Sequence, residues 1–315
     1  MNPVTKKQRL NYGMLTAHAF WSARKLEDKP ILPDYALFGL QSALKVFDKV
    51  YLWHYEPVEN APEGVFKQDA AMLLSVTEKN ILMMKNITVA HISDIVRFKA
   101  AAMLGGWVID CDNFWLRSPP EGFVFTTLWA KRTGGVAPRS NAWKNMAHAF
   151  AKEDWDGGDS INTPFSVDCD TEFAHALMVM VNEFVRKALV GNAWTVPPKK
   201  DQWNVLMWGL RQLILSHNMG RFVRPPIEYG VAPYWGGFAD KILEDGYFDL
   251  EEERRTKFGV TFPSTEEILR TAFCIPTSFA LSERNGLYNG LDIRLFAENH
   301  PTSLLGQIVE HITKM

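Results

Sequence analysis

The sequence has little cysteine and no excess of charge of either sign. Three cysteines, at positions 111, 169 and 274, occur among 315 residues. Their odd number and the lack of a C-x-x-C pair exclude an even disulfide framework and a cysteine zinc site of the usual spacing. With 34 Lys and Arg against 36 Asp and Glu, the formal net charge is −2, which excludes a polybasic nucleic-acid-binding coat and an acidic disordered tail. We therefore expect a reducing, cytoplasmic location.

Long hydrophobic runs are also missing. No stretch reaches the roughly 18 apolar residues that a membrane helix needs, and the basic start of the chain leads into no apolar signal region. We expect no transmembrane segment. What the sequence does contain is 47% hydrophobic and 22% charged residues, with 11 Trp and 20 Phe. These are globular proportions, in which aromatic rings serve as core filler or as walls of sugar and nucleobase sites.

The first hundred residues show the pattern of an α/β domain. An apolar run over 15–21 predicts a buried strand, and apolar residues spaced by three and four over 34–47 predict a helix that buries Leu37, Leu40, Leu44 and Phe47. The β-branched and aromatic run over 50–55 predicts a second strand. Strand, helix and strand in about 40 residues indicate a βαβ unit and a parallel sheet.

A second helix and strand follow this unit. Ser93 is placed to cap a helix whose buried face includes Met103 and which ends at Gly105-Gly106. A strand over 107–109 then leads into Asp110-Cys111-Asp112. Farther on, the pattern predicts a strand over 123–129 and helices over 173–189 and 201–216, whereas the C-terminal third reads as turns with short apolar pieces.

The carboxylates Asp110 and Asp112 end a buried strand. Oxygen ligands of this kind suit Mg²⁺ or Mn²⁺, although a plain strand-end turn remains an equal alternative from the residues alone. The same spelling recurs at 154–156 and 168–170. Those two sites lack the preceding apolar strand and double-glycine helix stop, so we interpret them as turns or caps.

Two motifs together resemble a known family. Ser93-Asp94-x-x-Arg97 and Leu104-Gly105-Gly106-Trp107-x-Ile109-Asp110-x-Asp112 are similar to the sugar-binding region of DXD-containing glycosyltransferases, a group with initiating mannosyltransferases, capsular polysaccharide transferases and clostridial toxin glucosyltransferases. Upstream, Phe20-Trp21 and the segments 50–56, 62–65 and 69–70 resemble the N-terminal part of the capsular members. The resemblance covers about residues 15–120, with Trp107 where Tyr is usual.

The resemblance implies a fold and an activity. The fold would be α/β, a GT-A-like Rossmann-type single domain over 1–315 with a mixed, mostly parallel central sheet and additional C-terminal helices. Residues 15–120 would form the nucleotide-sugar-binding core and 121–315 the acceptor-side and C-terminal elements. The activity would be metal-dependent, retaining transfer of a sugar from a nucleotide-sugar donor to a hydroxyl acceptor.

The resemblance also assigns roles to four residues of the two motifs. Asp94 would bind the donor sugar or ribose, and Arg97, one helical turn on, would reach the sugar or diphosphate. A local ion pair on a solvated face is the alternative for this pair. Asp110 would contact the ribose or the metal, and Asp112 would coordinate Mn²⁺ or Mg²⁺.

Four further residues are assigned less directly. Phe20 and Trp21 would lie beside the nucleobase, with ordinary core packing as the alternative. Asn162 would contact the sugar or acceptor. His300 is our candidate for the C-terminal metal or phosphate ligand, although an exposed loop histidine would look the same.

Two other classes of function stay open. A haloacid-dehalogenase-type phosphatase would use Asp110 as its nucleophile. However, the strand before Asp110 is not N-terminal, and Asn113 stands where such phosphatases favour Thr or Val. This interpretation also leaves the motif of Asp94 and Arg97 unexplained. A non-catalytic sugar- or nucleotide-binding module is the other.

The acceptor could be a glycan precursor, a protein or a hydroxylated DNA base, and an anionic acceptor would need a basic groove. The cations that could line such a groove are Lys199, Lys200, Arg221, Arg224, Arg254 and Arg255.

Overall fold

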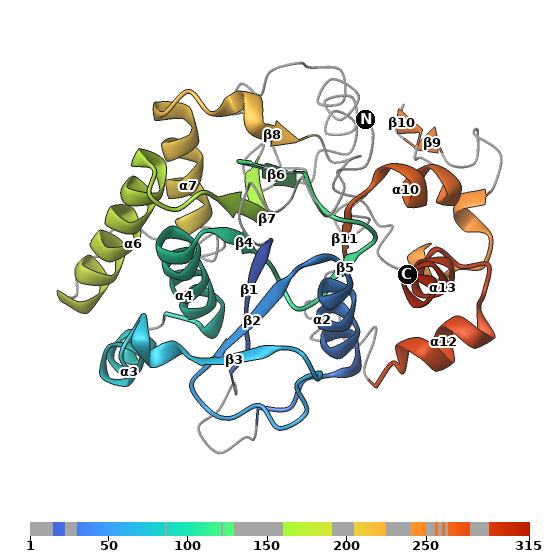
Figure 1. Ribbon diagram of the computed structural model, residues 1–315, viewed down its shortest axis with the longest axis horizontal. Helices are drawn as coiled ribbons and strands as arrows, with labels where there is room; N and C mark the ends of the chain where they lie inside the picture. The colour runs from blue at the N-terminus through green and yellow to red at the C-terminus, as the bar shows by residue number, and fades with distance from the viewer. Residues whose placement is uncertain are drawn as a thin grey trace.

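The central feature of the computed structural model is a seven-stranded sheet. The structure describes residues 15–22, 30–85, 87–120, 122–128, 160–190, 205–224, 241–249, 256–257, 260–261, 264–277 and 290–315. In spatial order the strands are β3 (Phe66–Asp69), β2 (Lys49–His54), β1 (Thr16–Phe20), β4 (Gly106–Val108), β7 (Ser160–Val167), β6 (Phe125–Leu128) and β8 (Val223–Arg224) (Figure 1).

The sheet is mixed but mostly parallel. The pairs β3–β2, β2–β1, β1–β4 and β6–β8 are parallel, whereas β4–β7 and β7–β6 are antiparallel. The predicted α/β class with a mixed, mostly parallel sheet and C-terminal helices is therefore confirmed. Because β1, β2, β3 and β4 run the same way, their carboxyl ends meet at one edge, where α/β sheets place their ligands.

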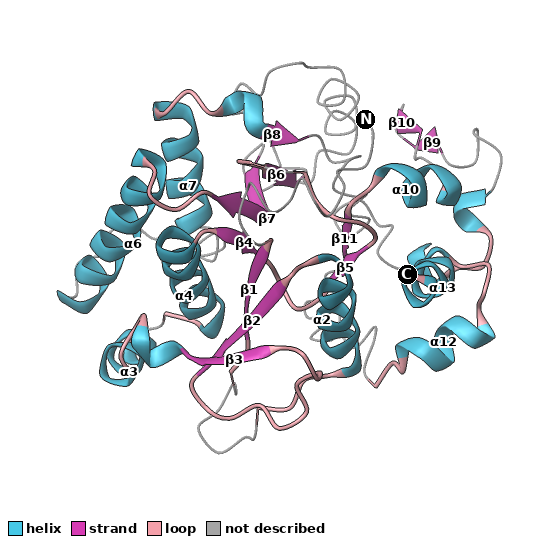
Figure 2. Ribbon diagram, viewed as in Figure 1, coloured by secondary structure: helices cyan, strands magenta, loops and turns pink. Residues whose placement is uncertain are grey.

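Helices cover both faces of this sheet (Figures 1 and 2). One core contains side chains of α3, α4, α6 and α7, and the other contains side chains of α2 and the C-terminal helices together with a small ribbon of β5 and β11. The bounds are α2 (Asp34–Val46), η1 (Ala70–Met72), α3 (Val76–Met84), α4 (Val89–Leu104), β5 (Asn113–Trp115), α6 (Glu172–Val190), α7 (Val205–Ser216), η3 (Gly220–Phe222), η5 (Lys241–Leu243), η6 (Tyr247–Asp249), β9 (Thr256–Lys257), β10 (Val260–Thr261), α10 (Thr265–Thr271), β11 (Cys274–Pro276), α12 (Ile293–Asn299) and α13 (Leu304–Lys314).

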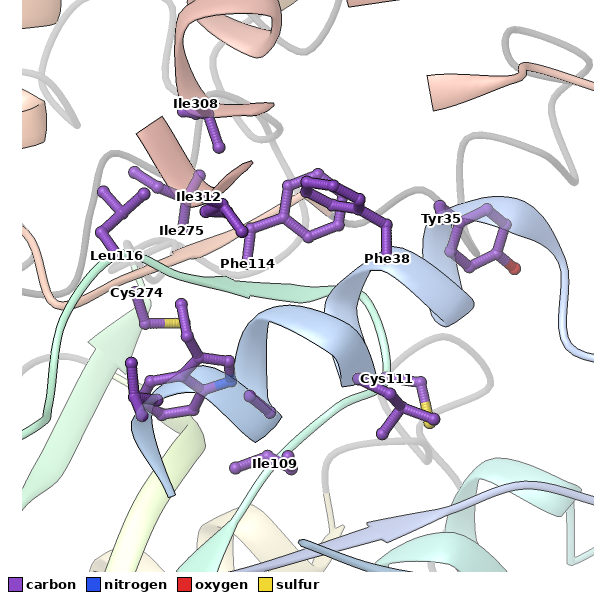
Figure 3. Packing of buried hydrophobic residues seen from close by; sticks show 14 of the residues in the cluster. Tyr35, Phe38, Ile109, Cys111, Phe114, Leu116, Cys274, Ile275, Ile308 and Ile312 are labelled. Carbon is purple, nitrogen blue, oxygen red and sulfur yellow. The ribbon is translucent and has the colours of Figure 1, made fainter. Parts of the chain in front are cut away.

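The buried face of helix α2 differs from the predicted one. Leu40 and Phe47 are buried as expected, whereas Leu37 and Leu44 are only partly buried. The helix comes closest to the segment after β4 at Gly39, where an added Cβ would lie 2.0 Å from the backbone oxygen of Cys111. Aromatic packing between α2 and β5, with α13 above it, completes this core (Figure 3).

The start of α4 differs from the prediction, and its end agrees with it. The helix begins at Val89 behind Thr88, which forms a capping box with His91, so Ser93 lies inside the helix and is not its cap. Met103 is 57% exposed and not part of the buried face. The helix stops at Gly105, whose φ of 70° favours glycine at that position.

Several elements were not anticipated. Strand β3 has only four residues, β7 contains Pro164, and the capping box of Ser75 and Glu78 that begins α3 was overlooked. C-terminal helices were expected, but their bounds were not. The predicted helix over 201–216 is observed from Val205, and residues 201–204 lie outside the described part of the chain. Among the described residues, no helix combines the length and apolar character required to cross a bilayer.

Candidate functional site

The residues of the two sequence motifs meet at the carboxyl ends of β1 and β4. The amide of Ile109 donates to the carbonyl of His18 at 3.1 Å, which extends the β1–β4 pairing beyond the strands. The Cys111 thiol donates to the carbonyl of Phe20 at 3.5 Å. The segment Asp110-Cys111-Asp112 therefore lies directly beside the end of β1, as a site at this edge requires.

Arg97 connects the helix motif to the strand motif. Its Nη2 donates to Asp94 Oδ1 at 2.8 Å, and its Nη1 donates both to Asp110 Oδ1 and to the Ile109 carbonyl, each at 2.6 Å. Its Nε donates to the Ser93 carbonyl at 3.3 Å. Of the five N–H donors of a guanidinium, four are used inside the protein. The side chain is only 4% exposed, so the pair with Asp94 is not the solvated surface ion pair that was the alternative.

The burial of this cluster changes its electrostatics. The pKa of Asp94 is raised to about 7, chiefly by burial; the positive charge of Arg97 lowers it, and the nearby negative charge of Asp110 raises it. Burial by itself would lower the pKa of Arg97, but Asp110 and Asp94 more than compensate and the pKa is raised. Arg97 therefore keeps its charge, while Asp94 can carry a proton near neutral pH.

Asp110 is held from two sides yet remains accessible. Arg97 binds its Oδ1, and the hydroxyl of Thr163 on β7 donates to its Oδ2. The Asp110 side chain is 41% exposed. Asp112 is fixed through its backbone, because its carbonyl accepts hydrogen bonds from the Thr277 amide at 3.2 Å and hydroxyl at 2.8 Å. Thr277 directly follows β11.

The two aspartates match the hard oxygen donors that a divalent cation prefers. Within the part of the chain that the structure describes, no group of three or more His, Cys, Asp and Glu side chains is arranged to hold a metal ion. Mg²⁺ is commonly bound by one or two carboxylates together with substrate phosphates and water. The pair Asp110 and Asp112 fits that second kind of site, in which the substrate supplies the remaining ligands.

The two aromatic residues at the end of β1, Phe20 and Trp21, face different cores. Phe20 is 7% exposed and packs edge-on against Tyr55, with ring centroids 6.2 Å apart. Trp21 is partly buried against the core on the α2 side, and its amide donates to the Trp53 carbonyl at 3.0 Å. Of the two, Trp21 retains more ring surface for a ligand.

The remaining predicted residues lie elsewhere. Asn162 pairs with Thr126 in the ladder of β7 and β6, and its side chain is outside the described part. His300 follows α12, where its Nδ1 bonds Asp245 Oδ2 at 2.8 Å and its ring stacks on Phe296. The structure does not group His300 with Asp110 and Asp112.

The other Asp-x-Asp triplets and the predicted basic groove can be placed only in part. Residues 168–170 form the turn before α6, with Asp170 at a φ of 61°, as interpreted from the sequence. Residues 154–156 lie outside the described part. Arg221 is exposed over the ring of Phe222, and Arg224 is in β8. Outside the described residues lie Lys199, Lys200, Arg254 and Arg255.

Sequence reasoning missed several polar groups at this edge. Ser22 donates to Glu56 at 2.8 Å, and Lys79, which is buried, donates to the same carboxylate at 3.0 Å. Thr163 was also missed. Its only available signal was its position next to Asn162, because its contact with Asp110 depends on strand pairing that the sequence does not reveal.

Comparison with known proteins finds similarity among solved structures but not among sequences. No family model matches this sequence, and no curated protein sequence matches it. Among solved structures, the chain is similar to one described as PaToxG Glycosyltransferase, with a TM-score of 0.40 and 12% sequence identity over 83% of this chain and 89% of that chain. Identity at this level does not transfer an activity from one protein to another.

Proposed function

We propose that this protein is a glycosyltransferase that binds a nucleotide-sugar at the carboxyl ends of β1 and β4 and transfers the sugar to a hydroxyl acceptor. The observation that carries the proposal is the cluster of Asp94, Arg97 and Asp110, which joins both motifs beside the end of β1. A motif resemblance alone predicts no spatial contact between its parts. Here the parts are in direct contact, at the edge of the sheet where such a ligand would bind.

The described residues can divide the work of donor binding. Asp110 presents an oriented, half-exposed carboxylate, and Asp112 follows it on a backbone held by Thr277. We propose that this pair binds Mn²⁺ or Mg²⁺, which when bound would neutralise the charge that develops on the diphosphate leaving group. Because the pKa of Asp94 is about 7, this side chain can either accept a hydrogen bond from a hydroxyl of the nucleotide-sugar or donate one to it. Trp21 would lie beside the nucleobase.

Retention of the anomeric configuration is part of the proposal. It is supported by the resemblance of the two motifs to those of retaining enzymes. Asp110 and Asp112 would then act on the departing diphosphate only through the cation that they would hold, and Asp94 would bind a sugar hydroxyl. Stabilisation of the leaving group by that cation would be the largest contribution.

The phosphatase alternative has less support. It makes Asp110 a nucleophile, but an Arg97 ion pair on one oxygen and a Thr163 hydrogen bond on the other withdraw electron density from the attacking carboxylate. A non-catalytic module would bind a nucleotide-sugar without turning it over. An assay for product therefore separates it from the enzyme, and release of phosphate from p-nitrophenyl phosphate would support the phosphatase.

The first test is a thermal-shift screen of UDP-, GDP-, ADP- and CMP-sugars, with and without Mn²⁺. A ligand that binds only the folded state at about 100 times its Kd stabilises that state by about 2.7 kcal/mol. We expect one nucleotide class to raise the melting temperature in a Mn²⁺-dependent way. If none of the four classes shifts the melting temperature, the proposed function is wrong.

A further inference from the structure

Thr163 lies opposite Asp110 across two strands that are far apart in the sequence. Strand β7 runs antiparallel to β4, with Val108 paired to Phe165. Continuing this register by two residues places Thr163 opposite Asp110. Val108 and Phe165 are both buried in the core that contains side chains of α4, and the hydroxyl of Thr163 donates to Oδ2 of Asp110. Thr163, Asp110 and the helix that carries Arg97 therefore converge on one side.

The contacts at this point hold both oxygens of one carboxylate. Arg97 binds Oδ1 of Asp110 at 2.6 Å, and the Thr163 hydroxyl donates to Oδ2. Thr163 is 1% exposed and the Arg97 side chain 4%, whereas the Asp110 side chain is 41% exposed. The buried guanidinium of Arg97 on α4 and the buried hydroxyl of Thr163 on β7 thus both bind the accessible carboxylate of Asp110, which follows β4.

Holding both oxygens fixes the rotation of the carboxylate. An ionised carboxylate has about four lone-pair directions, and here two of them receive hydrogen bonds from inside the protein. The side chain as a whole is 41% exposed, so a ligand can reach it. With Arg97 alone, the carboxylate could still turn about its Cβ–Cγ bond, since one hydrogen bond on one oxygen does not define the plane of the group. Thr163 supplies the second point that defines it.

We propose that Thr163 is a positioning residue: its hydroxyl, together with Arg97, sets the orientation in which Asp110 meets the donor or its metal ion. The inference rests on the proposed function, because it concerns the same site. Preorganised ligand groups held by supporting hydrogen bonds bind more tightly than groups that must first be ordered, and loss of such a support reduces metal affinity or activity by about 10- to 100-fold.

The test compares Thr163→Val, which removes the hydroxyl while keeping the shape, with Thr163→Ser, which keeps the hydroxyl. Calorimetric titrations with MnCl₂ plus UDP, GDP, ADP or CMP measure binding to each variant and to the wild type. We expect at least tenfold weaker binding for Thr163→Val and less than threefold change for Thr163→Ser, with melting temperatures close to that of the wild type. Unchanged affinity of Thr163→Val, in a protein whose wild type binds, overturns the inference.

A second readout is independent of any ligand. Crystal structures of the wild type, Thr163→Ser and Thr163→Val report the torsion about the Cβ–Cγ bond of Asp110 directly. We expect the same carboxylate orientation in the wild type and Thr163→Ser, and a rotated or disordered carboxylate in Thr163→Val; the same orientation in all three overturns the inference. If the wild type binds none of the nucleotides, the proposed function fails and these crystal structures alone decide whether Thr163 orients Asp110. If Thr163→Val does not fold, Thr163→Ala removes the same hydroxyl and is compared in the same way.

Discussion

Arg97 is the residue that holds the candidate site together. It is buried, charged, and bonded to two carboxylates and two backbone carbonyls from α4 and the end of β4. Removing one partner of a buried ion pair leaves the other charge without compensation and costs about 3–5 kcal/mol. A side chain in this position supports the fold as well as the orientation of Asp94 and Asp110.

We therefore expect Arg97→Ala to lower the free energy of unfolding by about 3–5 kcal/mol, as measured by urea denaturation. The matched control is Arg186→Ala, since Arg186 also pairs with an acidic residue three positions away on a helix but is 63% exposed. Its loss should change the free energy of unfolding far less, because water screens an exposed ion pair. Equal effects of the two substitutions would show that the Arg97 cluster is no more stabilising than a surface ion pair.

Asp112 is expected to affect function and not stability. Asp112→Asn keeps the size of the side chain and the backbone carbonyl that Thr277 binds, so the melting temperature should change by no more than a few degrees. The amide is a poorer ligand for a hard cation than a carboxylate, and Mn²⁺-dependent activity should fall at least 100-fold. Wild-type turnover by the variant would exclude Asp112 from the metal site.

At the scale of elements, the position of the Asp110–Asp112 segment depends on how closely α2 approaches it. Gly39 is the contact point, because a Cβ there would come within 2.0 Å of the Cys111 carbonyl oxygen and 3.3 Å of that of Asn113. Backbone atoms cannot move aside as a flexible side chain can. The helix and the segment must therefore separate if any side chain is added.

Gly39→Ala should lower the free energy of unfolding by at least 2 kcal/mol, although alanine favours a helix over glycine by about 1 kcal/mol. The control is Gly209→Ala on α7, where the nearest atom is the Met180 sulfur at 2.4 Å and a flexible side chain can move. Gly209→Ala should change the free energy of unfolding by no more than about 1 kcal/mol. The comparison is made by chemical denaturation, and a Gly39→Ala variant as stable as the wild type would contradict the close packing.

At the scale of the whole molecule, one buried histidine connects the central strands to the end of α4. His18 on β1 is 0% exposed. Its Nε2 bonds the Gly105 carbonyl at 2.8 Å, and Trp53 Nε1 donates to its Nδ1 at 3.3 Å. This pattern requires the neutral ring, with its proton on Nε2. The pKa of His18 is lowered to about 4, because the effect of burial exceeds the opposite effect of the hydrogen bond to Gly105.

The lowered pKa of His18 predicts a loss of stability in acid. Between pH 6.5 and about 4, the unfolded chain binds a proton at this residue and the folded chain does not, so the free energy of unfolding falls as the pH decreases. The full effect is up to about 3 kcal/mol. Asp94, whose pKa is raised, acts in the opposite direction, so the wild type is compared with His18→Gln. The difference between the two curves should shrink toward pH 4, and a constant difference would contradict the assignment.

Local features of the sequence were sufficient for much of the sheet and for half of the site. The βαβ unit was predictable because its periodicity is contained in about 40 residues, and the end of α4 because two glycines are a local signal. The start of α4 was not predictable, because Thr88 and Ser93 can both cap a helix. In the structure the capping box of Thr88 with His91 places the start at Val89. The proximity of Asp94 and Arg97 followed from helical spacing alone.

What the sequence determined by itself is therefore the chemistry available: two carboxylates at the end of a strand, and an acidic and a basic residue one helical turn apart. Only the tertiary structure decided how they act. Arg97 is buried and bound to Asp110 because α4 packs over the end of β4. Thr163 contacts Asp110, 53 residues away in the sequence, because β7 pairs antiparallel with β4. Such contacts depend on which strands pair and in what register, and that choice is made by the burial of the whole sheet, which no local pattern encodes.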